Sequence, residues 1–179
     1  MLIWIGIIPP KKIFNEVSRL QKKMGNKYNT YHELKGLLGP HVTLLIKNEI
    51  GKKEAEEIEN VLKGICNETR SFNLKVDGIK FFRKGKYTCL KVDKSKKIND
   101  LYKKISKKMI RIGKTIRFGN FTPHIAIAGN EIEMNDLKKM IIELEKMKIK
   151  YKFEVNRLYI ARGTPDLRVK ISKSFKLNV

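Results

Sequence analysis

Two of the three histidines in this 179-residue chain stand in the same local sequence, which suggests that they act together. His41 lies in PHVTLLI and His124 lies in PHIAIAG, so each follows a proline and precedes an apolar run. Imidazole titrates near neutral pH, so one ring can accept a proton while another donates one. A phosphoester suits such a pair, because attack and departure take place on opposite sides of phosphorus. Alternate residues of a strand share a face, so Thr43 projects with His41 and could donate a hydrogen bond to a phosphate oxygen or orient the imidazole.

Two other interpretations of the histidines are weaker. Each ring could be a packing residue with satisfied nitrogens, and for either histidine alone this would be preferred. The match between the two motifs favours function for the pair. Zinc is disfavoured, because neither motif contains an acidic residue and two histidines cannot fill a zinc shell. We therefore expect no metal and no cofactor. His32, in TYHELKG, lacks a strand context and is interpreted as a loop or helix-start residue.

The elements that position these motifs form an internal repeat. Hydrophobic periodicity predicts strand, helix, strand, helix and strand in each half of the chain. In the first half these elements are predicted, in that order, at 2–8, 10–25, 40–46, 52–69 and 71–82, the last of these as one strand or a broken pair. In the second half they are predicted at 87–93, 94–113, 123–129, 133–148 and 151–161. A final strand is predicted at 167–177.

Such a repeat predicts an α+β fold in a single bilobal domain, with halves of approximately 1–84 and 85–179. Each lobe would carry helices on one side of a mainly antiparallel sheet. If a pseudo-two-fold axis relates the lobes, His41 and His124 share one central cleft.

The chain is strongly basic, with 40 Lys and Arg residues against 18 Asp and Glu and a formal net charge of +22. This charge attracts polyanions, of which nucleic acid is the commonest in cells. Only eight of the basic residues are arginine, and many of the lysines would simply be solvated on helix faces. The charge therefore permits a nucleotide or RNA substrate without demonstrating one.

Other features of the composition indicate a soluble protein. No stretch approaches the ~20 apolar residues that a bilayer requires. The opening MLIWIGII lacks a basic leader and a cleavage site, which indicates a buried first strand rather than a signal peptide. We expect a cytoplasmic protein without membrane contact. Cys66 and Cys89 stand apart from any CxxC pair, so two buried thiols are expected.

PHVTLLI and PHIAIAG resemble the paired H-φ-[T/S]-φ motifs, φ being apolar, of the two-histidine (2H) phosphoesterase superfamily. The chain is more narrowly similar to the LigT-like group of 2′-5′ RNA ligases and RNA 2′,3′-cyclic phosphodiesterases. The separation of His41 from His124 along the chain matches the family's spacing, and both ends of the chain resemble the family's first and last elements.

The resemblance implies a LigT-like fold with a basic central groove and metal-independent chemistry. The implied reaction opens a 2′,3′-cyclic phosphate on RNA ends or nucleotides, and its reversal gives 2′-5′ ligation. By analogy, His124 activates water and His41 protonates the leaving ribose oxygen, although the roles could be exchanged. The expected partner is RNA or a nucleotide with a cyclic phosphate, bound by a monomer.

One position departs from the family pattern, because Ala126 stands where a hydroxyl residue is expected. The lost hydrogen bond would weaken an enzyme without abolishing it, since both proton-transfer groups remain. We hypothesise that Thr122, two residues before His124, partly replaces this hydroxyl. Further candidate substrate-binding residues lie near the motifs or at the end of a strand: Tyr31, Arg117, Phe118 and Arg162.

Two alternatives to an active enzyme stay open. The chain could be a 2H-fold protein that binds RNA ends or a small cyclic nucleotide with little turnover, and Ala126 favours this. It could also be a basic RNA-associated protein with structural histidines. Turnover that is lost in both histidine variants would support the enzyme. Tight binding without turnover would support the binding protein, and salt-sensitive binding that does not depend on either histidine would support the RNA-associated protein.

Overall fold

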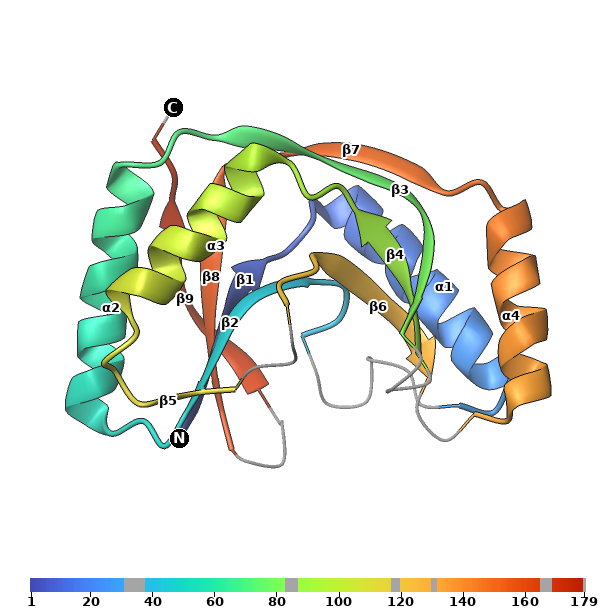
Figure 1. The fold of residues 1–179 in the computed structure, drawn as a ribbon, viewed down its shortest axis with the longest axis horizontal. Coiled ribbons are helices and arrows are strands. Elements are labelled where there is room, and N and C mark those ends of the chain that lie inside the picture. Colours follow the sequence, from blue (N-terminus) through green and yellow to red (C-terminus); the bar gives the residue numbers. More distant parts are fainter. Residues whose placement is uncertain (31–37, 83–86, 117–119, 130–131, 165–168, 179) are drawn as a thin grey trace.

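The computed structural model describes residues 1–30, 38–82, 87–116, 120–129, 132–164 and 169–178 (Figure 1). Helices and strands alternate along these residues in the order β1 (Leu2–Ile7), α1 (Lys11–Lys27), β2 (Val42–Asn48), α2 (Lys52–Asn67), β3 (Phe72–Phe82), β4 (Tyr87–Val92), α3 (Lys96–Lys108), β5 (Lys114–Thr115), β6 (His124–Gly129), α4 (Met134–Lys146), β7 (Lys150–Val155), β8 (Arg157–Gly163) and β9 (Val169–Lys176). None of the helices in the described ranges is long and apolar enough to cross a bilayer.

The strands form two antiparallel sheets. The first has the order β5-β2-β1-β8-β9 and the second has the order β6-β4-β3-β7. Helices α2 and α3 pack on the first sheet, and α1 and α4 pack on the second. In Figure 1 the helices lie outside and the sheets lie between them, so the predicted α+β bilobal fold is confirmed.

The two lobes exchange elements. Strand β1 belongs to the first sheet, but the helix that follows it, α1, packs on β6 of the second. Helix α3 makes the reverse crossing, from β4 in the second sheet to β2 in the first. Each lobe is therefore built from both halves of the sequence.

The single strand predicted at 151–161 is wrong. This segment is two strands, β7 and β8, which lie in different sheets and are separated only by Asn156. The Asn156 carbonyl accepts a 2.8 Å hydrogen bond from the Leu177 N–H. No Gly or Pro marks the break, and its only local sign is a shift in the apolar alternation, because two polar residues separate Val155 from Leu158.

Two other boundaries differ from the predictions. The helix expected to run to residue 113 ends at Lys108, and the short strand β5 follows it. Gly113 precedes β5 with φ +52, a conformation that favours glycine. Strand β3 is continuous from Phe72 to Phe82, with an irregularity between Val76 and Ile79 that absorbs the expected break.

The two halves of the sequence repeat share the same irregularity in strand pairing. The β1–β2 pairing shifts register between Ile5 and Gly6, and the β4–β6 pairing shifts between Thr88 and Cys89. The second shift follows the first by the same separation that divides His41 from His124. The two motifs thus occupy equivalent strands, β2 and β6, with the same local distortion. Residues of the two half-sites are therefore structurally equivalent when they are separated along the chain as His41 and His124 are.

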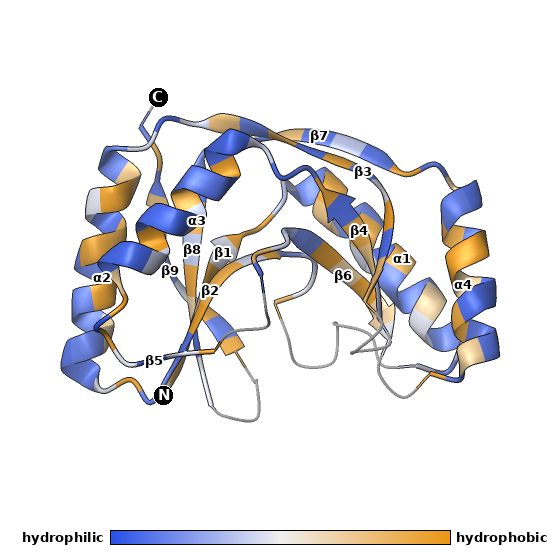
Figure 2. Ribbon diagram, in the orientation of Figure 1, coloured by the Kyte–Doolittle hydropathy of each residue, from blue (hydrophilic) through white to orange (hydrophobic). Residues whose placement is uncertain are grey.

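Apolar side chains cover both faces of the first sheet. Ile3, Ile5 and Ile7 join the main core beneath the helices. Trp4 belongs to a smaller cluster with Leu2, Leu38 and Ala161. Adjacent strand residues project to opposite faces, so Trp4 points away from the helices. In Figure 2 hydrophobic colouring follows β1 and β2, two central strands of this sheet, which agrees with burial of both faces there.

The cysteines match the prediction of free, buried thiols. Cys66 and Cys89 form no disulfide, and both are fully buried. Burial raises the pKa of each thiol to about 12, so both stay protonated at neutral pH.

Candidate active site

Each histidine is held by the carbonyl two residues before it. His41 Nδ1 lies 2.7 Å from the Gly39 oxygen, and His124 Nδ1 lies 2.7 Å from the Thr122 oxygen. A carbonyl only accepts, so Nδ1 carries the hydrogen and the neutral ring keeps its lone pair on Nε2. The proline between each pair disfavours helical backbone at the residue before it, which helps to present that carbonyl. Both half-sites thus leave Nε2 for proton transfer.

Burial keeps both rings neutral in the free protein. It lowers the pKa of His41 to about 4, although the Gly39 carbonyl opposes the shift, and the charge of His124 lowers that pKa further. Burial also lowers the pKa of His124, opposed by the Thr122 carbonyl and reinforced by the positive charge of Lys80. The two rings are close enough to act on each other electrostatically. A bound anion would favour the protonated form of either ring.

Trp4 orients the hydroxyl of Thr43. The indole Nε1–H donates a 2.9 Å hydrogen bond to Thr43 Oγ1, so the hydroxyl hydrogen is left for another acceptor. The same indole meets the His41 ring edge-on, with ring centroids 5.1 Å apart. Gly6 makes room for it, because a Cβ there would collide with the indole ring. Trp4 thereby helps to position both the Thr43 hydroxyl and the His41 imidazole.

The second half-site contains an aromatic cluster around His124. The Phe82 and Tyr87 rings stack with centroids 5.0 Å apart, and Phe82 lies 5.0 Å from the His124 ring. The Tyr87 hydroxyl lies 3.5 Å from His124 Nε2. Lys80 Nζ lies over the Phe82 ring at 5.2 Å from its centroid, which brings a positive charge to this side of the cleft.

One hollow joins the two motifs. Its lining comprises Thr43, Leu44, Leu45, Ile46, Phe82, Tyr87, Tyr102, Thr115, Ile116, Asn120, Phe121, Thr122 and His124. Thr43 comes from the first motif, whereas Thr122 and His124 come from the second. His41 directly precedes β2, which approaches β6 in space. The hollow therefore brings Thr43 of the first motif together with Thr122 and His124 of the second, and His41 is not part of its lining.

Ala126 lies on the same strand face as His124, two residues further along β6. It pairs with Cys89 across the sheet, and its carbonyl accepts a 2.8 Å hydrogen bond from the Gln21 amide. The hydroxyl of Thr122 donates to the Asn120 carbonyl at 3.3 Å. Its proposed role in place of the residue 126 hydroxyl stays a prediction.

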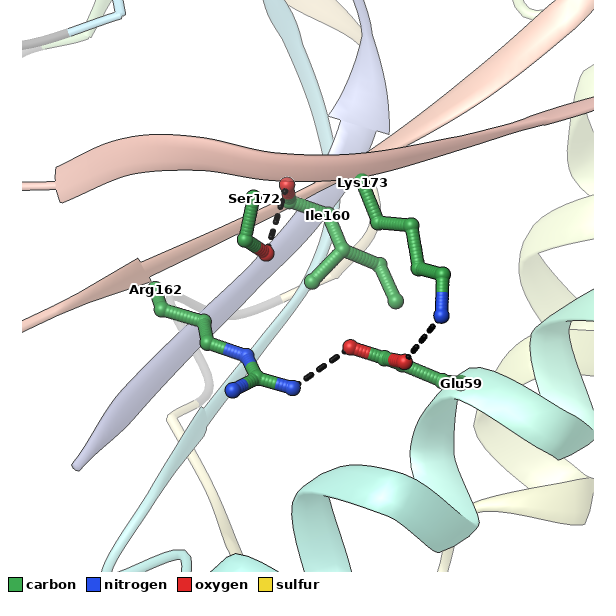
Figure 3. Close-up of polar contacts among 5 residues, drawn as sticks. All are labelled: Glu59, Ile160, Arg162, Ser172 and Lys173. Carbon is green, nitrogen blue, oxygen red and sulfur yellow. Dashed lines mark hydrogen bonds and ion pairs between the residues drawn. The ribbon is translucent and has the colours of Figure 1, made fainter.

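Arg162 is not brought to the hollow. It pairs with Ile3 across the sheet and so projects toward α2, on the face opposite Trp4. There its Nη2 lies 2.5 Å from Glu59 Oε1, while Lys173 Nζ lies 2.8 Å from Glu59 Oε2 (Figure 3). Burial of Glu59 opposes ionisation, but hydrogen bonds from Lys173 and Arg162 outweigh it and lower the carboxyl pKa. Arg162 therefore ties β8 to a helix.

Tyr31, Arg117 and Phe118 lie outside the described residues, as does His32, and their roles stay predictions. Sequence reasoning did not single out Trp4, Lys80, Phe82 or Tyr87. Trp4 and Tyr87 are separated along the chain as His41 and His124 are, so extending the repeat to the neighbouring strands could have found them. In the described ranges, no three His, Cys, Asp or Glu side chains cluster as a metal site would require.

Comparison with known proteins establishes the family. The sequence model of the 2'-5' RNA ligase superfamily matches residues 9–166, and the chain belongs to this family. This family assignment confirms the resemblance to the two-histidine phosphoesterase superfamily and its LigT-like group that the motifs indicated. The chain is also similar to the Oceanobacillus iheyensis protein named "Putative phosphoesterase OB1230", with 26% identity over 142 residues, 79% of this chain and 77% of the relative.

Solved structures share the fold at low sequence identity. TT0787 of Thermus thermophilus has a TM-score of 0.72 and 14% identity, with 99% of this chain and 98% of that chain covered. Escherichia coli LigT complexed with 3'-AMP has a TM-score of 0.66 and 14% identity, with the same coverage. The predicted LigT-like bilobal fold is thus confirmed.

Replacing Trp4 by Phe should lower turnover of a phosphoester substrate about three- to tenfold. Phe keeps an aromatic ring beside His41 but removes the N–H that orients the Thr43 hydroxyl, a net loss of about 1 kcal/mol. Steady-state kinetics of the variant check this, with Thr43→Val as the companion. Additive effects of the two changes would contradict the coupling, which predicts that Trp4→Phe costs little once the hydroxyl is gone.

The lowered pKa of His41 predicts a pH-dependent stability. Between the ordinary histidine value of 6.5 and the native value of about 4, the unfolded chain binds a proton that native His41 does not. Stability should therefore fall as the pH falls, by about 1–2 kcal/mol from pH 7 to pH 5 for this group. Urea unfolding at both pH values checks this. His41→Gln should show the smaller loss, and equal losses in both proteins would refute the assignment.

Proposed function

We propose that the protein is a metal-independent phosphodiesterase that opens 2′,3′-cyclic phosphates on RNA ends or nucleotides. One observation carries the proposal: two equivalent histidines, each with Nδ1–H held by a backbone carbonyl, offer Nε2 from half-sites close enough to act on each other electrostatically. Membership of the 2'-5' RNA ligase superfamily supports phosphoester chemistry.

In the proposed hydrolysis, Nε2 of His124 takes a proton from water as the water oxygen bonds to phosphorus. The bond from phosphorus to one ribose oxygen breaks, and protonated His41 gives its Nε2 proton to that oxygen. The product is a phosphomonoester with a free neighbouring hydroxyl. With the 5′-hydroxyl of a second RNA end in place of water as the nucleophile, and the ribose 3′-oxygen as the leaving group, the same steps would join RNA ends through a 2′-5′ bond. The near-symmetry of the half-sites also allows the two histidines to exchange roles.

The surrounding groups suit a phosphate between the two rings. The negative phosphate raises the pKa of nearby imidazoles, which allows one of two otherwise neutral rings to serve as the acid. The Thr43 hydroxyl accepts from Trp4 and can therefore donate to a non-bridging oxygen. Lys80, whose charge already acts on His124, adds attraction for the anion. General acid–base catalysis by such a pair needs no metal.

The aromatic wall of the hollow suits the nucleoside part of the substrate. The Tyr102 and Phe121 rings stack in parallel, with centroids 4.0 Å apart, and both line the hollow beside Thr43 and His124. Aromatic faces commonly stack on nucleobases. The structural neighbour E. coli LigT was crystallised with 3'-AMP and with ATP, which supports a nucleotide ligand here.

A second candidate function is the binding of RNA ends or a small cyclic nucleotide with little turnover. Ala126 favours it, because a hydroxyl missing beside His124 weakens stabilisation of charge on the phosphate. The strong positive charge of the chain would support binding in either case.

Removing either histidine should strongly lower turnover. We expect His41→Ala and His124→Ala each to lower kcat by about 10²–10⁴, because each removes one proton-transfer group. Phosphorus NMR of a nucleoside 2′,3′-cyclic phosphate incubated with each protein in EDTA measures this directly. Conversion to one monoester by the wild type alone supports the enzyme. Wild-type binding without conversion supports the second candidate, and turnover unchanged in either variant would refute the paired mechanism.

A further inference from the structure

The two half-sites differ in where their hydroxyl groups lie. In the first, Thr43 carries a hydroxyl and the neighbouring indole of Trp4 donates to it at 2.9 Å. In the second, Ala126 stands at the equivalent place and has no donor. A phosphate held symmetrically between the histidines would therefore have one hydroxyl partner from the first motif and none from the second.

Tyr87 is the structural counterpart of Trp4. Trp4 pairs with Ile46 on β2, and Tyr87 pairs with Gly129 on β6, so the two aromatics are separated along the chain as their two partners are. Each aromatic side chain also contacts the histidine of its own half-site. The pseudo-symmetry thus places at residue 87 an aromatic ring that ends in a hydroxyl.

The Tyr87 hydroxyl lies where a phosphate oxygen would approach. It is 3.5 Å from Nε2 of His124, the nitrogen left for proton transfer. It lines the same hollow as Thr43 and His124. Its ring is held in place by stacking on Phe82, with an interplanar angle of 19°. At 3.5 Å the contact with Nε2 is long for an O–H donor, so an incoming acceptor can compete with Nε2 for the hydroxyl hydrogen.

We propose that Tyr87 supplies the phosphate-contacting hydroxyl that Ala126 lacks. In the free protein its O–H points toward the lone pair of neutral His124. When a cyclic phosphate occupies the hollow, the O–H donates instead to a non-bridging oxygen, opposite the donation from Thr43. This inference rests on the proposed function and names a further substrate-binding residue for it.

Thr122 is the competing donor for the same role. Its hydroxyl donates to the Asn120 carbonyl at 3.3 Å, and its own carbonyl is occupied by His124. Using that hydroxyl for phosphate would require the bond to Asn120 to break. Tyr87 is therefore the better placed donor.

Tyr87→Phe is the direct test, because it removes one oxygen and keeps the ring that stacks on Phe82. We expect kcat/KM for a nucleoside 2′,3′-cyclic phosphate to fall about ten- to a hundredfold, mainly through kcat. Tyr28→Phe is the matched control, since it removes a hydroxyl that donates to Glu143. It should leave kcat/KM unchanged. Equal rates for Tyr87→Phe and Tyr28→Phe would overturn the proposal.

Rescue separates a phosphate contact from a structural role. Adding Ala126→Thr to Tyr87→Phe should restore at least tenfold of the loss, because the new hydroxyl stands where Thr43 stands in the other half-site. Ala126→Val in the same background matches its shape without the hydroxyl and should restore nothing. Equal rates for the Thr and Val double variants would overturn the proposal, as would a loss in Tyr87→Phe fully accounted for by a lowered melting temperature.

Binding distinguishes failure of this inference from failure of the proposed function. If the wild type turns over no cyclic phosphate, Kd for adenosine 3′-monophosphate is compared between Tyr87→Phe and Tyr28→Phe by NMR titration. A tenfold weaker Kd for Tyr87→Phe alone supports the Tyr87 contact without turnover. An equal Kd for the two variants rejects the Tyr87 contact. If the wild type does turn over the substrate, and turnover is lost in both histidine variants but unchanged in Tyr87→Phe, the Tyr87 contact is rejected and the proposed function stands.

Discussion

The hydrogen bond from each histidine Nδ1 to the carbonyl two residues earlier is the interaction on which the site depends. It fixes the tautomer, so the lone pair of the neutral ring lies on Nε2. Without it, either nitrogen could carry the hydrogen and neither ring would be oriented for proton transfer. The proline before each histidine explains why the two motifs begin alike, since it shapes the backbone that presents the carbonyl.

Exchange of elements between the lobes holds the two half-sites together. Helix α1 follows β1 of the first sheet but packs on β6, which carries His124. Its buried Gln21 donates a 2.8 Å hydrogen bond to the Ala126 carbonyl, and Thr30, just beyond the helix, donates to the Gly129 carbonyl at 2.7 Å. The backbone of the second motif is thus bonded to the first half of the sequence. Because α1 follows directly from β1 of the first sheet and is bonded to the strand that carries His124, the short connection between β1 and α1 links the two lobes.

The sequence predicted the features that depend on local pattern and spacing. The repeat was sufficient for the α+β bilobal fold, and the hollow brings Thr43 and His124 together. The sequence pattern did not predict which strands pair or which side chains meet, because these contacts depend on the tertiary fold. The break at Asn156 sends β7 and β8 to different sheets with no Gly or Pro to mark it, and Arg162 faces a helix because of its register with β1. The aromatic ring of Tyr87 reaches the site from the neighbouring strand β4, which lies outside both histidine motifs, so the spacing of the motifs alone does not indicate it.

The proposed chemistry requires that one phosphate be held between His41 and His124. The most direct measurement is a ¹⁵N NMR titration of the histidine side chains with adenosine 3′-monophosphate, repeated across pH. We expect the Nε2 signals of both histidines to shift with one shared Kd. Both pKa values should also rise on binding, because an anion favours the imidazolium form. A shift and pKa rise confined to one histidine, or two different Kd values, would contradict a shared phosphate site.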